Sequence, residues 1–599
     1  MVARVLVTTA VEETWPADQP IMFLGGWCQR FPRREHWQSL DATVARPYGR
    51  SQAQRDVDYQ YVHKVHKLLL KDVSRNLNQI HGVDHTERYW QIVLGHWLIR
   101  YTCLIFNRWA TLKQCLEEND LIGISVIRDD AYDLATLDTV GTSWAANDDY
   151  WNAVLDSRIV TRYLGDRIPL IFVHPDKPHS SFVHAKPDVV PITLSSKQKA
   201  ASALRRAMRS IRRGREVFLL NTYLSSAIEA KLEFLFGQAP KTWSTLDVDI
   251  FSSDNIDRQL LQFQIETADE FVSCAGAFLY ELMPKCLVES YQSVVTQSEQ
   301  VPWPRNPKII FTSNNFDSDE LFKVWAAAKV EAGSRYFTGQ HGNNIGTRKN
   351  YPTESECLDT SDKFVTWGWV DGDLKHAPAF IFKTVGGTKP TIDPSGGLLL
   401  VDLSIENRLW PWDTDVDIEI HQNEQFQFVD NLPEDIRNQV TLRLWHSHEL
   451  LPWADKERWL DRFPAISYER GQAPMNELVA KHRLVVHSYD STGILEGLYW
   501  NNPLIAFWAG GLEHLRESAH PYYQLLVESG IVHLSPLSAA DHISGIWENV
   551  DQWWMSEKVQ SARREFCSRY ARDSGSPTKD IKKILTGPKI QIASDRGSL

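Results

Sequence analysis

The sequence predicts an α/β protein built from two Rossmann-like domains that face each other across a cleft, the first of them rich in helices. Short apolar segments typical of buried parallel strands alternate with segments that have apolar residues at helical spacing. The chain of 599 residues exceeds the roughly 250–300 residues that one hydrophobic core usually serves. The segment 383–396, KTVGGTKPTIDPSG, is rich in Gly, Pro and Thr and is the expected linker between the two domains.

The part before the linker, residues 1–382, is expected to be one helix-rich α/β domain. Ala3–Ala10 is apolar enough for a buried strand, and two long stretches, 52–80 and 86–118, have apolar residues at helical spacing. The other expected elements of this domain are two strands and one mostly helical region, at Phe218–Leu224, Lys308–Ser313 and Leu260–Tyr291 respectively.

The part after the linker, residues 397–555, alternates strands and helices more regularly and is expected to be a Rossmann-like domain. Leu484–Trp508 reads LVVHSYDSTGILEGLYWNNPLIAFW, which parses as a strand, a hydroxyl-rich turn, a helix and a second strand. Two further strands are expected at 397–404 and 441–445. Residues 556–599 are expected to form a charged closing helix and a tail.

The composition is that of a globular protein of a reducing compartment. Seven cysteines are scattered without a CxxC pair, which argues against disulfides and structural zinc. No apolar run approaches the length of a membrane helix, about 20 residues, and the first residues do not resemble a signal peptide. We therefore expect a cytoplasmic protein. The net charge of −12 argues against a nucleic-acid partner.

One basic segment, 197–215, contrasts with this acidic chain because it holds eight Lys and Arg residues and no acid. It is either a solvated helix face or a surface that touches anionic membrane lipid. We adopt the second interpretation, which predicts a protein at the inner face of the membrane.

The turn Ser491-Thr492-Gly493 is the best candidate for binding a phosphate group. It lies at the start of the helix within 484–508, where unpaired backbone N–H groups, two hydroxyls and the helix dipole favour an anion. Glu496, one turn into the helix, can accept hydrogen bonds from a ribose. Arg443 and His487, near the ends of two predicted strands, complete the expected donor-binding set. The alternative is an ordinary capped helix, because Ser and Thr are favoured N-cap residues.

A glycine-rich loop in the first half, Thr338–Thr347, is the best candidate for the catalytic side. It reads TGQHGNNIGT, and its glycines allow the backbone to pass close to a ligand. His341 is the best general acid or base, because an unperturbed imidazole titrates near neutrality. A tight loop whose histidine is satisfied by the backbone is the alternative. The expected substrate contacts of this loop are Gln340, Gly342, Asn343 and Asn344.

Carboxylates follow the strand expected at 308–313 and lie in the same region of the chain. Asp317 and Glu320, in the sequence FTSNNFDSDE, are expected to include a base or nucleophile. Capping of the next helix by these acids and Asp319 is the alternative. Asp-x-Asp pairs elsewhere carry little information in a chain of this length, so no metal site and no cofactor are expected.

Several phrases of the sequence together resemble one bacterial family of transferases, linked to surface-carbohydrate assembly and first named from a spirochaete protein. The likeness runs from residue 1 to about residue 510. It is carried by VLVTTAVEETWP near the start, RYW…GHW, FNRW, FTSNNF, GQHGNNIG, FVTWGW and HSYDSTGILEGLYWNNP. Asn343-Asn344 departs from the family pattern, where Gly-Gly or Gly-Asn is expected, so this loop should be less permissive.

More distantly, the chain is similar to two-domain GT-B glycosyltransferases, and its second half resembles the Kdo transferases. This resemblance implies that Ser491-Thr492-Gly493 holds the donor phosphate and that no metal is needed. It implies a glycosyltransferase that moves a sugar from a nucleotide-sugar, such as CMP-Kdo, to a surface-polysaccharide or lipopolysaccharide acceptor. Residues 1–382 would then bind the acceptor and residues 397–555 the donor.

Two other functions agree with the same motifs. One is a different enzyme on this architecture, either a nucleotide-sugar epimerase or a polyol-phosphate transferase. The other is a non-catalytic partner in polysaccharide assembly. Product analysis separates the first from a glycosyltransferase, and affinity for nucleotides separates the second.

Overall fold

The computed structural model of the chain describes residues 3–175, 216–403 and 418–588, apart from short gaps between 239 and 260 and at 452. The basic segment 197–215 lies outside the described residues, so the membrane contact expected there stays a prediction. Among the described residues, no helix combines the length and the apolar character needed to span a bilayer.

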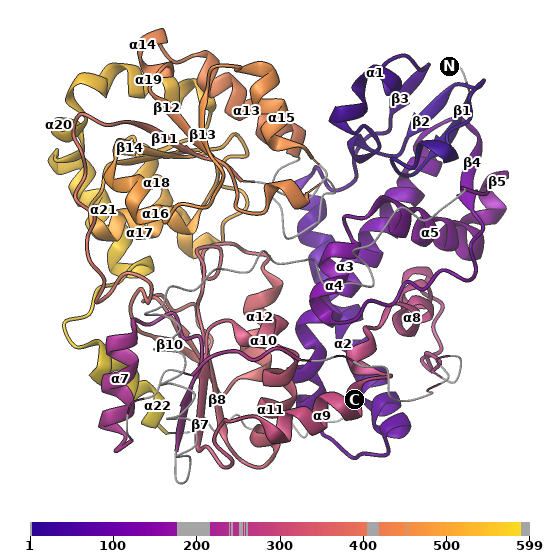
Figure 1. The fold of residues 1–599 in the computed structure, drawn as a ribbon, viewed down its shortest axis with the longest axis horizontal. Helices are drawn as coiled ribbons and strands as arrows, with labels where there is room; N and C mark the ends of the chain where they lie inside the picture. The colour runs from indigo at the N-terminus through magenta and orange to yellow at the C-terminus, as the bar shows by residue number, and fades with distance from the viewer. Residues whose placement is uncertain are drawn as a thin grey trace, which may run out of the picture.

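Three parallel β-sheets form the framework of the molecule (Figure 1). The first has strand order β3-β2-β1-β4-β5, the second β10-β9-β8-β7-β6, and the third β13-β12-β11-β14-β15-β16. The first and third orders reverse beside their first strand, which creates the switch point where open α/β sheets bind ligands. The strands are β1 Arg4–Val7, β2 Ile21–Phe23, β3 Ala42–Val44, β4 Leu121–Ile127, β5 Leu170–Val173, β6 Val217–Leu219, β7 Ile309–Thr312, β8 Arg335–Gly339, β9 Lys363–Thr366, β10 His376–Pro378, β11 Gly397–Val401, β12 Val440–Arg443, β13 Ser467–Glu469, β14 His482–His487, β15 Leu504–Phe507 and β16 Val532–His533.

The α/β class with parallel sheets, expected from the sequence, is confirmed. The part of the chain before residue 383 holds two sheets, the first and the second. Strand β1 of the first sheet lies within the strand predicted at Ala3–Ala10, whereas β2 and β3, with only three residues each, are too short to show a period of two and were not predicted.

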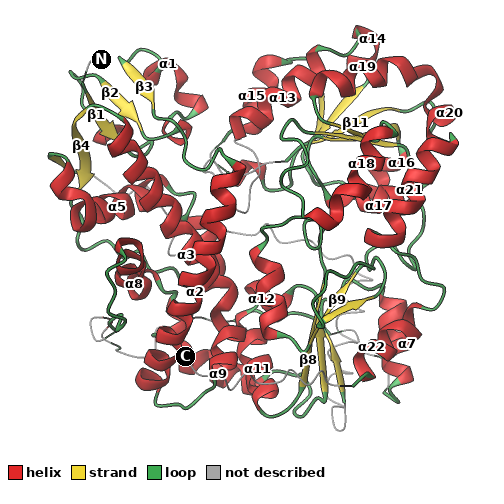
Figure 2. Cartoon of the chain, turned by 180° about the vertical axis from the view of Figure 1, so that it is seen from behind, coloured by secondary structure: helices red, strands yellow, loops and turns green. Residues whose placement is uncertain are grey.

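Two long helices, α2 (Gln52–His81) and α3 (Glu87–Glu118), join the first sheet to the second (Figures 1 and 2). Both were predicted from their apolar spacing, and both are confirmed. Helix α3 is buried on almost every side because it packs against α2 and three other helices, α8 (Glu270–Leu282), α11 (Glu320–Glu331) and α12 (Pro352–Thr360).

The second sheet separates two cores. Side chains alternate along its strands, so Phe218, Ile310 and Tyr336 pack into the core shared with the first sheet and α3. Residues next to them in the same strands, such as Phe311 and Phe337, point to the opposite face and pack into a core shared with the third sheet and the C-terminal helices. A separate core fills the other face of the third sheet. The first and second sheets therefore form one body through a continuous core.

The third sheet and its helices, residues 397–570, form what we call the third-sheet unit. After α21 (Glu557–Tyr570) the chain returns to the second sheet, where α22 (Pro577–Thr586) packs against α7 (Ser226–Leu235) (Figure 1). The remaining α-helices are α1 Arg34–Trp37, α4 Thr139–Ala145, α5 Asp149–Ile159, α9 Tyr291–Gln300, α10 Asn315–Ser318, α13 Ile418–Asp430, α14 Glu434–Arg437, α15 Asp455–Arg462, α16 Met475–Ala480, α17 Thr492–Trp500, α18 His520–Glu528, α19 Pro536–Ile546 and α20 Val550–Trp554.

The two crossings between the second sheet and the third-sheet unit lie side by side. The backbone N–H of Ile381, on the outgoing crossing, donates to the carbonyl of Arg572 on the return crossing at 2.9 Å. The N–H of Arg572 in turn donates to the carbonyl of Trp367, after β9, at 3.0 Å. The third-sheet unit is thus connected to the rest of the chain by two adjacent, hydrogen-bonded segments.

Candidate functional site

The carboxyl edges of the second and third sheets meet at one place. The loop 340–346 follows β8 of the second sheet, and α17 follows β14 of the third. The backbone N–H of Asn343 donates to Thr492 Oγ1 at 3.1 Å, and Asn343 Nδ2 donates to Asp490 Oδ1 at 2.5 Å. The structure thus brings the Ser491-Thr492-Gly493 turn, which we call the phosphate turn, next to the glycine-rich loop, although the two lie in different halves of the sequence.

The first turn of α17 is capped and still accessible. Ser491 has an extended backbone, and its Oγ accepts the N–H of Gly493 at 2.9 Å. Glycine is required at 493 by packing, because a Cβ there would lie 2.4 Å from Cε1 of His487. Ser491 and His487 are buried, whereas Thr492 and Gly493 are partly exposed. Capping by Ser491 therefore leaves one side of the turn open to a ligand.

A cavity of about 90 Å³ lies beside this turn. Gly493, Glu496 and His487 line one side, and apolar side chains form most of the other walls. Among the described residues, His487 Nδ1 and Asn502 Oδ1 are buried without a hydrogen-bond partner. Burial lowers the pKa of His487 to about 4, and burial raises the pKa of Glu496 against the opposing charge of Lys383. Apolar walls with a few converging polar groups are typical of small-molecule sites.

Arg443 lies at the same edge of the third sheet. Val401 of β11 pairs with Arg443 on one side and with His487 on the other. Burial raises the pKa of Tyr489, while a hydrogen bond with Ser491 and the charge of Arg443 oppose that rise. The Nη2 group of Arg443 donates to the carbonyl of Ala473 at 3.5 Å, and its Nε lies 3.9 Å from Glu469 Oε2. Binding of a phosphate by Arg443 stays a prediction.

A buried network centred on Asp490 holds the two loops together. Besides Asn343, the carboxylate of Asp490 accepts hydrogen bonds from Tyr523 Oη at 2.9 and 3.0 Å, and His514 Nε2 lies 3.4 Å away. The side chains of Asp490 and His514 are only 7% and 6% exposed. Sequence reasoning missed this network because its members come from the turn before α17, from the segment before α18, from α18 itself and from the 340–346 loop, which only the fold brings together.

We expect Asp490→Ala to lower the free energy of unfolding by about 3 kcal/mol, because the buried Tyr523 hydroxyl and Asn343 amide each lose a charged acceptor. Chemical denaturation measures this change. The matched control is Asp573→Ala, since exposed Asp573 also accepts a hydrogen bond from a tyrosine, Tyr499, at 2.8 Å. The control should change stability by only about 0.5 kcal/mol. Equal losses in both variants would contradict the role of Asp490.

On the other side of the meeting point, four residues form what we call the His341 cluster: His341, Asp317, Arg100 and His96. Asp317 follows β7, and its Oδ1 pairs with Nη1 of Arg100 on α3 at 2.7 Å. The ring of Phe316 lies 5.9 Å from that of His341 and stacks on His96 at 4.7 Å. Two predicted catalytic residues, His341 and Asp317, are therefore neighbours in the fold.

The electrostatics of the His341 cluster favour one neutral and one charged group. Burial lowers the pKa of His341 to about 4, so its imidazole is neutral at neutral pH. Burial alone would raise the pKa of Asp317, but the charges of Arg100 and His96 hold it at about 2. Nδ1 of His341 is buried without a partner among the described residues. A neutral imidazole beside a fixed carboxylate can accept a proton from a hydroxyl.

Glu320 lies apart from this cluster. It is buried, and its Oε1 accepts hydrogen bonds from both N–H and Oγ1 of Thr139, at 3.1 and 2.5 Å. Its Oε2 pairs with Nζ of buried Lys323 at 3.0 Å. Asp319 caps α11 by accepting the N–H of Phe322 at 2.9 Å. Asp319 is therefore a helix cap, as the alternative interpretation expected. Glu320 is held by Thr139 and Lys323. Neither residue belongs to the site that we propose.

The predicted substrate loop is shaped from inside by Gln340. Its Oε1 accepts the N–H of Trp367 and the indole N–H of Trp369, both at 2.8 Å. Its Nε2 donates to the carbonyl of Gly342 at 2.8 Å. Gln340 is therefore a buried support, and the partly exposed members of the loop are His341, Gly342 and Asn344.

A second group of buried carboxyls lies at the switch point of the third sheet. Asp402 follows β11 and accepts a hydrogen bond from Gln425 Nε2 at 2.6 Å, and Gln425 also donates to Ser488 Oγ at 2.9 Å. Burial raises the pKa of Asp402 to about 6 and that of Glu424 to about 7. One oxygen of each carboxyl lacks a partner among the described residues. Sequence analysis did not identify this group, because Glu424 and Gln425 lie on α13 and reach the switch point only in the folded chain.

We expect the free energy of unfolding to fall when the pH drops from 7 to 5. Six histidines among the described residues have a pKa near 4 in the folded chain against 6.5 ordinarily: His63, His96, His341, His421, His487 and His533. The unfolded chain therefore binds more protons in this window, and each histidine removes up to about 1.4 kcal/mol per pH unit. Three carboxyls whose pKa is raised to about 6 or 7, Asp319, Asp402 and Glu424, act in the opposite sense but are fewer.

Chemical denaturation at pH 7 and at pH 5 measures this dependence. His421→Gln should flatten it, because glutamine cannot take up the proton that the unfolded chain binds at His421. A dependence as steep in His421→Gln as in the unmodified chain would contradict the assignment.

One protein family is similar to this chain over almost its whole length. The model of the LIC12162 family transferase matches residues 4–585. No curated protein matches the chain.

Several solved structures share the outline of part of the fold. They include S. aureus MnaA in a co-structure with UDP, at 12% identity and a TM-score of 0.37, covering 62% of this chain and 95% of that chain. Acinetobacter baumannii MurG has 10% identity and a TM-score of 0.31, covering 62% and 99%. WaaG, a glycosyltransferase involved in lipopolysaccharide biosynthesis, has 13% identity and a TM-score of 0.29, covering 62% and 100%. Similarities this low transfer no function to this chain.

Proposed function

Because the chain belongs to the LIC12162 family of transferases, we propose that it transfers a sugar from a nucleotide-sugar to a glycan. The observation that carries this proposal is the contact between the start of α17 and the 340–346 loop, through Asn343. It puts a phosphate-binding turn next to a group that can accept a proton. Transfer from an activated phosphate ester needs both groups at one place.

The donor would bind at the third-sheet unit. Its phosphate would bind the partly exposed turn at Thr492 and Gly493, where the helix dipole favours negative charge, and would also engage the hydroxyl of Ser491, which is buried in the folded chain. Glu496 would accept hydrogen bonds from the ribose, and the base would enter the cavity beside His487 and Asn502. Arg443 would neutralise the remaining phosphate charge. Each of these groups lies at the carboxyl edge of the third sheet or in the cavity beside α17.

The acceptor would approach from the second sheet. Its hydroxyl oxygen would attack the anomeric carbon while the bond from that carbon to the phosphate oxygen breaks, and His341 would take the hydroxyl proton. Asp317 would stabilise the resulting imidazolium and the positive charge that develops on the sugar. The departing phosphate would keep the electron pair, stabilised by the start of α17 and by Arg443. We propose that this stabilisation makes the transfer independent of metal.

The resemblance of 484–508 to Kdo transferases supports a finer proposal. The donor would be a CMP-activated ulosonic acid such as CMP-Kdo, and the acceptor a surface polysaccharide or lipopolysaccharide. The scattered cysteines support a reaction in the cytoplasm, and the basic segment 197–215 supports contact with the inner face of the membrane.

A thermal-shift screen over CMP, UDP, GDP and dTDP conjugates tests the proposal. A ligand at about 100 times its dissociation constant stabilises the folded chain by about 2.7 kcal/mol, so the correct nucleotide should raise the melting temperature clearly. We expect the CMP conjugates to give the largest shift. A chain that none of the four nucleotides stabilises would contradict nucleotide-sugar transfer. Products formed from the best donor then distinguish transfer to a glycan from epimerisation.

A further inference from the structure

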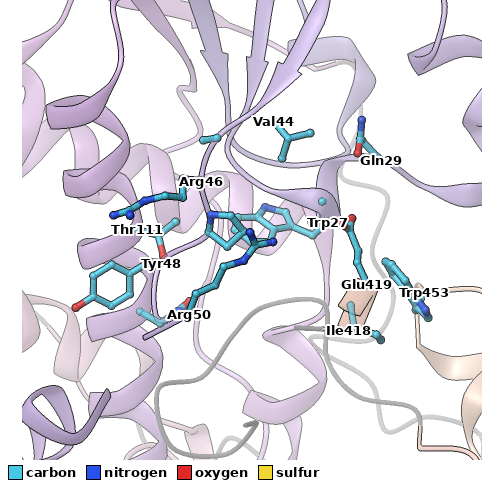
Figure 3. A pocket seen from close by; sticks show the side chains of 14 residues that line it. Trp27, Gln29, Val44, Arg46, Tyr48, Arg50, Thr111, Ile418, Glu419 and Trp453 are labelled. Carbon is cyan, nitrogen blue, oxygen red and sulfur yellow. The ribbon is translucent and has the colours of Figure 1, made fainter. Parts of the chain in front are cut away.

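A second pocket, of about 250 Å³, lies between the first sheet and the third-sheet unit (Figure 3). We propose that it binds a sugar unit of the acceptor glycan that carries an anionic group, a carboxylate or a phosphate. This inference rests on the proposed function, because it assigns the acceptor of that reaction.

The pocket is assembled from two bodies of the molecule. Arg46 and Arg50 come from the segment after β3, and Trp27 comes from the segment after β2, so all three lie at the carboxyl edge of the first sheet. Glu419 of α13 and Trp453, before α15, come from the third-sheet unit and lie on the opposite side (Figure 3). The contact is close, because a Cβ at Gly26 would lie 2.3 Å from Glu419 Oε1. The pocket is therefore complete only when the two bodies are together.

The side chains around the pocket include apolar and polar groups, which match the C–H face and the hydroxyl groups of a sugar. The indoles of Trp27 and Trp453 are held in place, because their N–H groups donate to Thr8 O at 2.8 Å and Gln422 Oε1 at 3.0 Å. Trp27 and Trp453 are 8% and 3% exposed, and the Arg458 guanidinium lies 3.7 Å from the Trp453 ring centroid, so each fixed indole offers a small apolar area for the C–H face of a sugar, at little entropic cost. The amide groups of Gln29 and Asn107 and the carboxylate of Glu419 line the same pocket, and such planar groups can bind two adjacent hydroxyls of a sugar.

Two arginines on one wall specify an anionic group on that sugar. The side chain of Arg46 is 67% exposed, and its Nη2 pairs with Glu118 Oε1 at 2.7 Å. The side chain of Arg50 lines the same wall and is drawn near Trp27 in the view of Figure 3. Guanidinium groups bind carboxylate and phosphate by paired, charge-assisted hydrogen bonds.

A nucleotide fits this place less well. The first sheet has its own switch point between β1 and β4, but tryptophans cover the end of β1. The indole N–H of Trp27 donates to Thr8 O, and that of Trp15 donates to Thr9 O at 3.0 Å. The pocket lies instead at β2 and β3 and is not preceded by a phosphate-binding helix start.

Helix α13 connects the pocket to the donor edge of the third sheet. Glu419 lines the pocket, and Gln425, six residues later, bonds Asp402 and Ser488 at the switch point. Six residues of α-helix span about 9 Å. A short oligosaccharide held in the pocket can therefore extend along α13 toward the transfer site.

Saturation-transfer NMR on the full chain, with glucuronate and glucose as probes, tests the inference without any donor. We expect glucuronate to bind about fivefold or more tightly than glucose, because only glucuronate engages the arginines. Arg46→Gln combined with Arg50→Gln should abolish that preference. Arg564→Gln, an exposed arginine paired with Glu557 on α21, should preserve it.

The outcomes separate this inference from the proposed function. Absence of glucuronate binding to the unmodified chain, or binding that the double variant leaves unchanged, overturns the pocket assignment. Calorimetry with the nucleotide chosen by the thermal-shift screen is run on the same samples, and the double variant should bind that nucleotide normally. Glucuronate binding without any nucleotide binding would support the pocket and contradict the nucleotide-sugar donor.

Discussion

Replacing Ser491 and Thr492 together by alanine is expected to weaken nucleotide binding between about tenfold and a hundredfold, while the chain stays folded. Each hydroxyl at the start of α17 can give one hydrogen bond to a phosphate, and hydrogen bonds to charged groups contribute about 1.5–3 kcal/mol. Thr492 has a second role, because its Oγ1 also accepts the N–H of Asn343. The single variant Thr492→Ala should therefore loosen the 340–346 loop, whereas Ser491→Ala should not.

Calorimetric titration with the best nucleotide measures this loss. Removing the N-cap also lowers stability by about 1 kcal/mol, which must be separated from the effect on binding. Thr86→Ala is the matched control, because Thr86 caps α3 in the same way, accepting the N–H of Tyr89 at 3.2 Å. It should destabilise the chain equally and leave affinity unchanged. Full nucleotide affinity in the double variant would refute the phosphate role of this turn.

The second large effect is expected for His341→Gln, which should slow sugar transfer by about 10²–10⁴-fold without weakening donor binding. The reason is geometric and electrostatic. His341 lies on the loop that contacts Thr492, and its neutral imidazole can take the proton of the attacking hydroxyl. Glutamine preserves polarity and approximate size but cannot accept that proton.

Release of nucleotide from the donor, followed against time, measures the rate. His533→Gln is the control, because His533 is also buried with a pKa near 4 but lies on β16, bonded to Ser538. It should lose stability without losing rate. An undiminished rate in His341→Gln would remove His341 from the mechanism and leave Asp317 or the Asp402 group as the proton acceptor.

Local pattern predicted those parts of the fold whose elements are long or strongly apolar. The unit at 484–508 forms β14, α17 and β15. Its two apolar strands and its hydroxyl-rich turn could be recognised from local sequence alone. Helices α2 and α3 appear for the same reason. Of the first sheet only β1 was predicted, within Ala3–Ala10, since three-residue strands such as β2 and β3 depend on neighbours that only the folded chain supplies.

The candidate site shows the same limit. Residue chemistry singled out Thr492 and Asn343 separately, and the structure places them in contact. No local pattern could predict the hydrogen bond between Thr139 and Glu320, because the two residues are 181 positions apart. They meet where α4 lies beside α11 in the folded chain. Asp490 likewise bonds Asn343, 147 positions away, and Tyr523, 33 positions away. Side chains whose role depends on a distant partner are therefore the ones that sequence reasoning misassigns or omits.

The paired crossings at Ile381 and Arg572 restrict how the molecule can move. Because the two connections to the third-sheet unit lie next to each other, a swing of that unit would turn about them and would have to open the core that it shares with the second sheet. Such a swing would carry Thr492 away from Asn343 and, on the far side, Glu419 away from Gly26. One rotation would therefore change access to both pockets, and a ligand bound in one pocket would favour the conformation that completes the other.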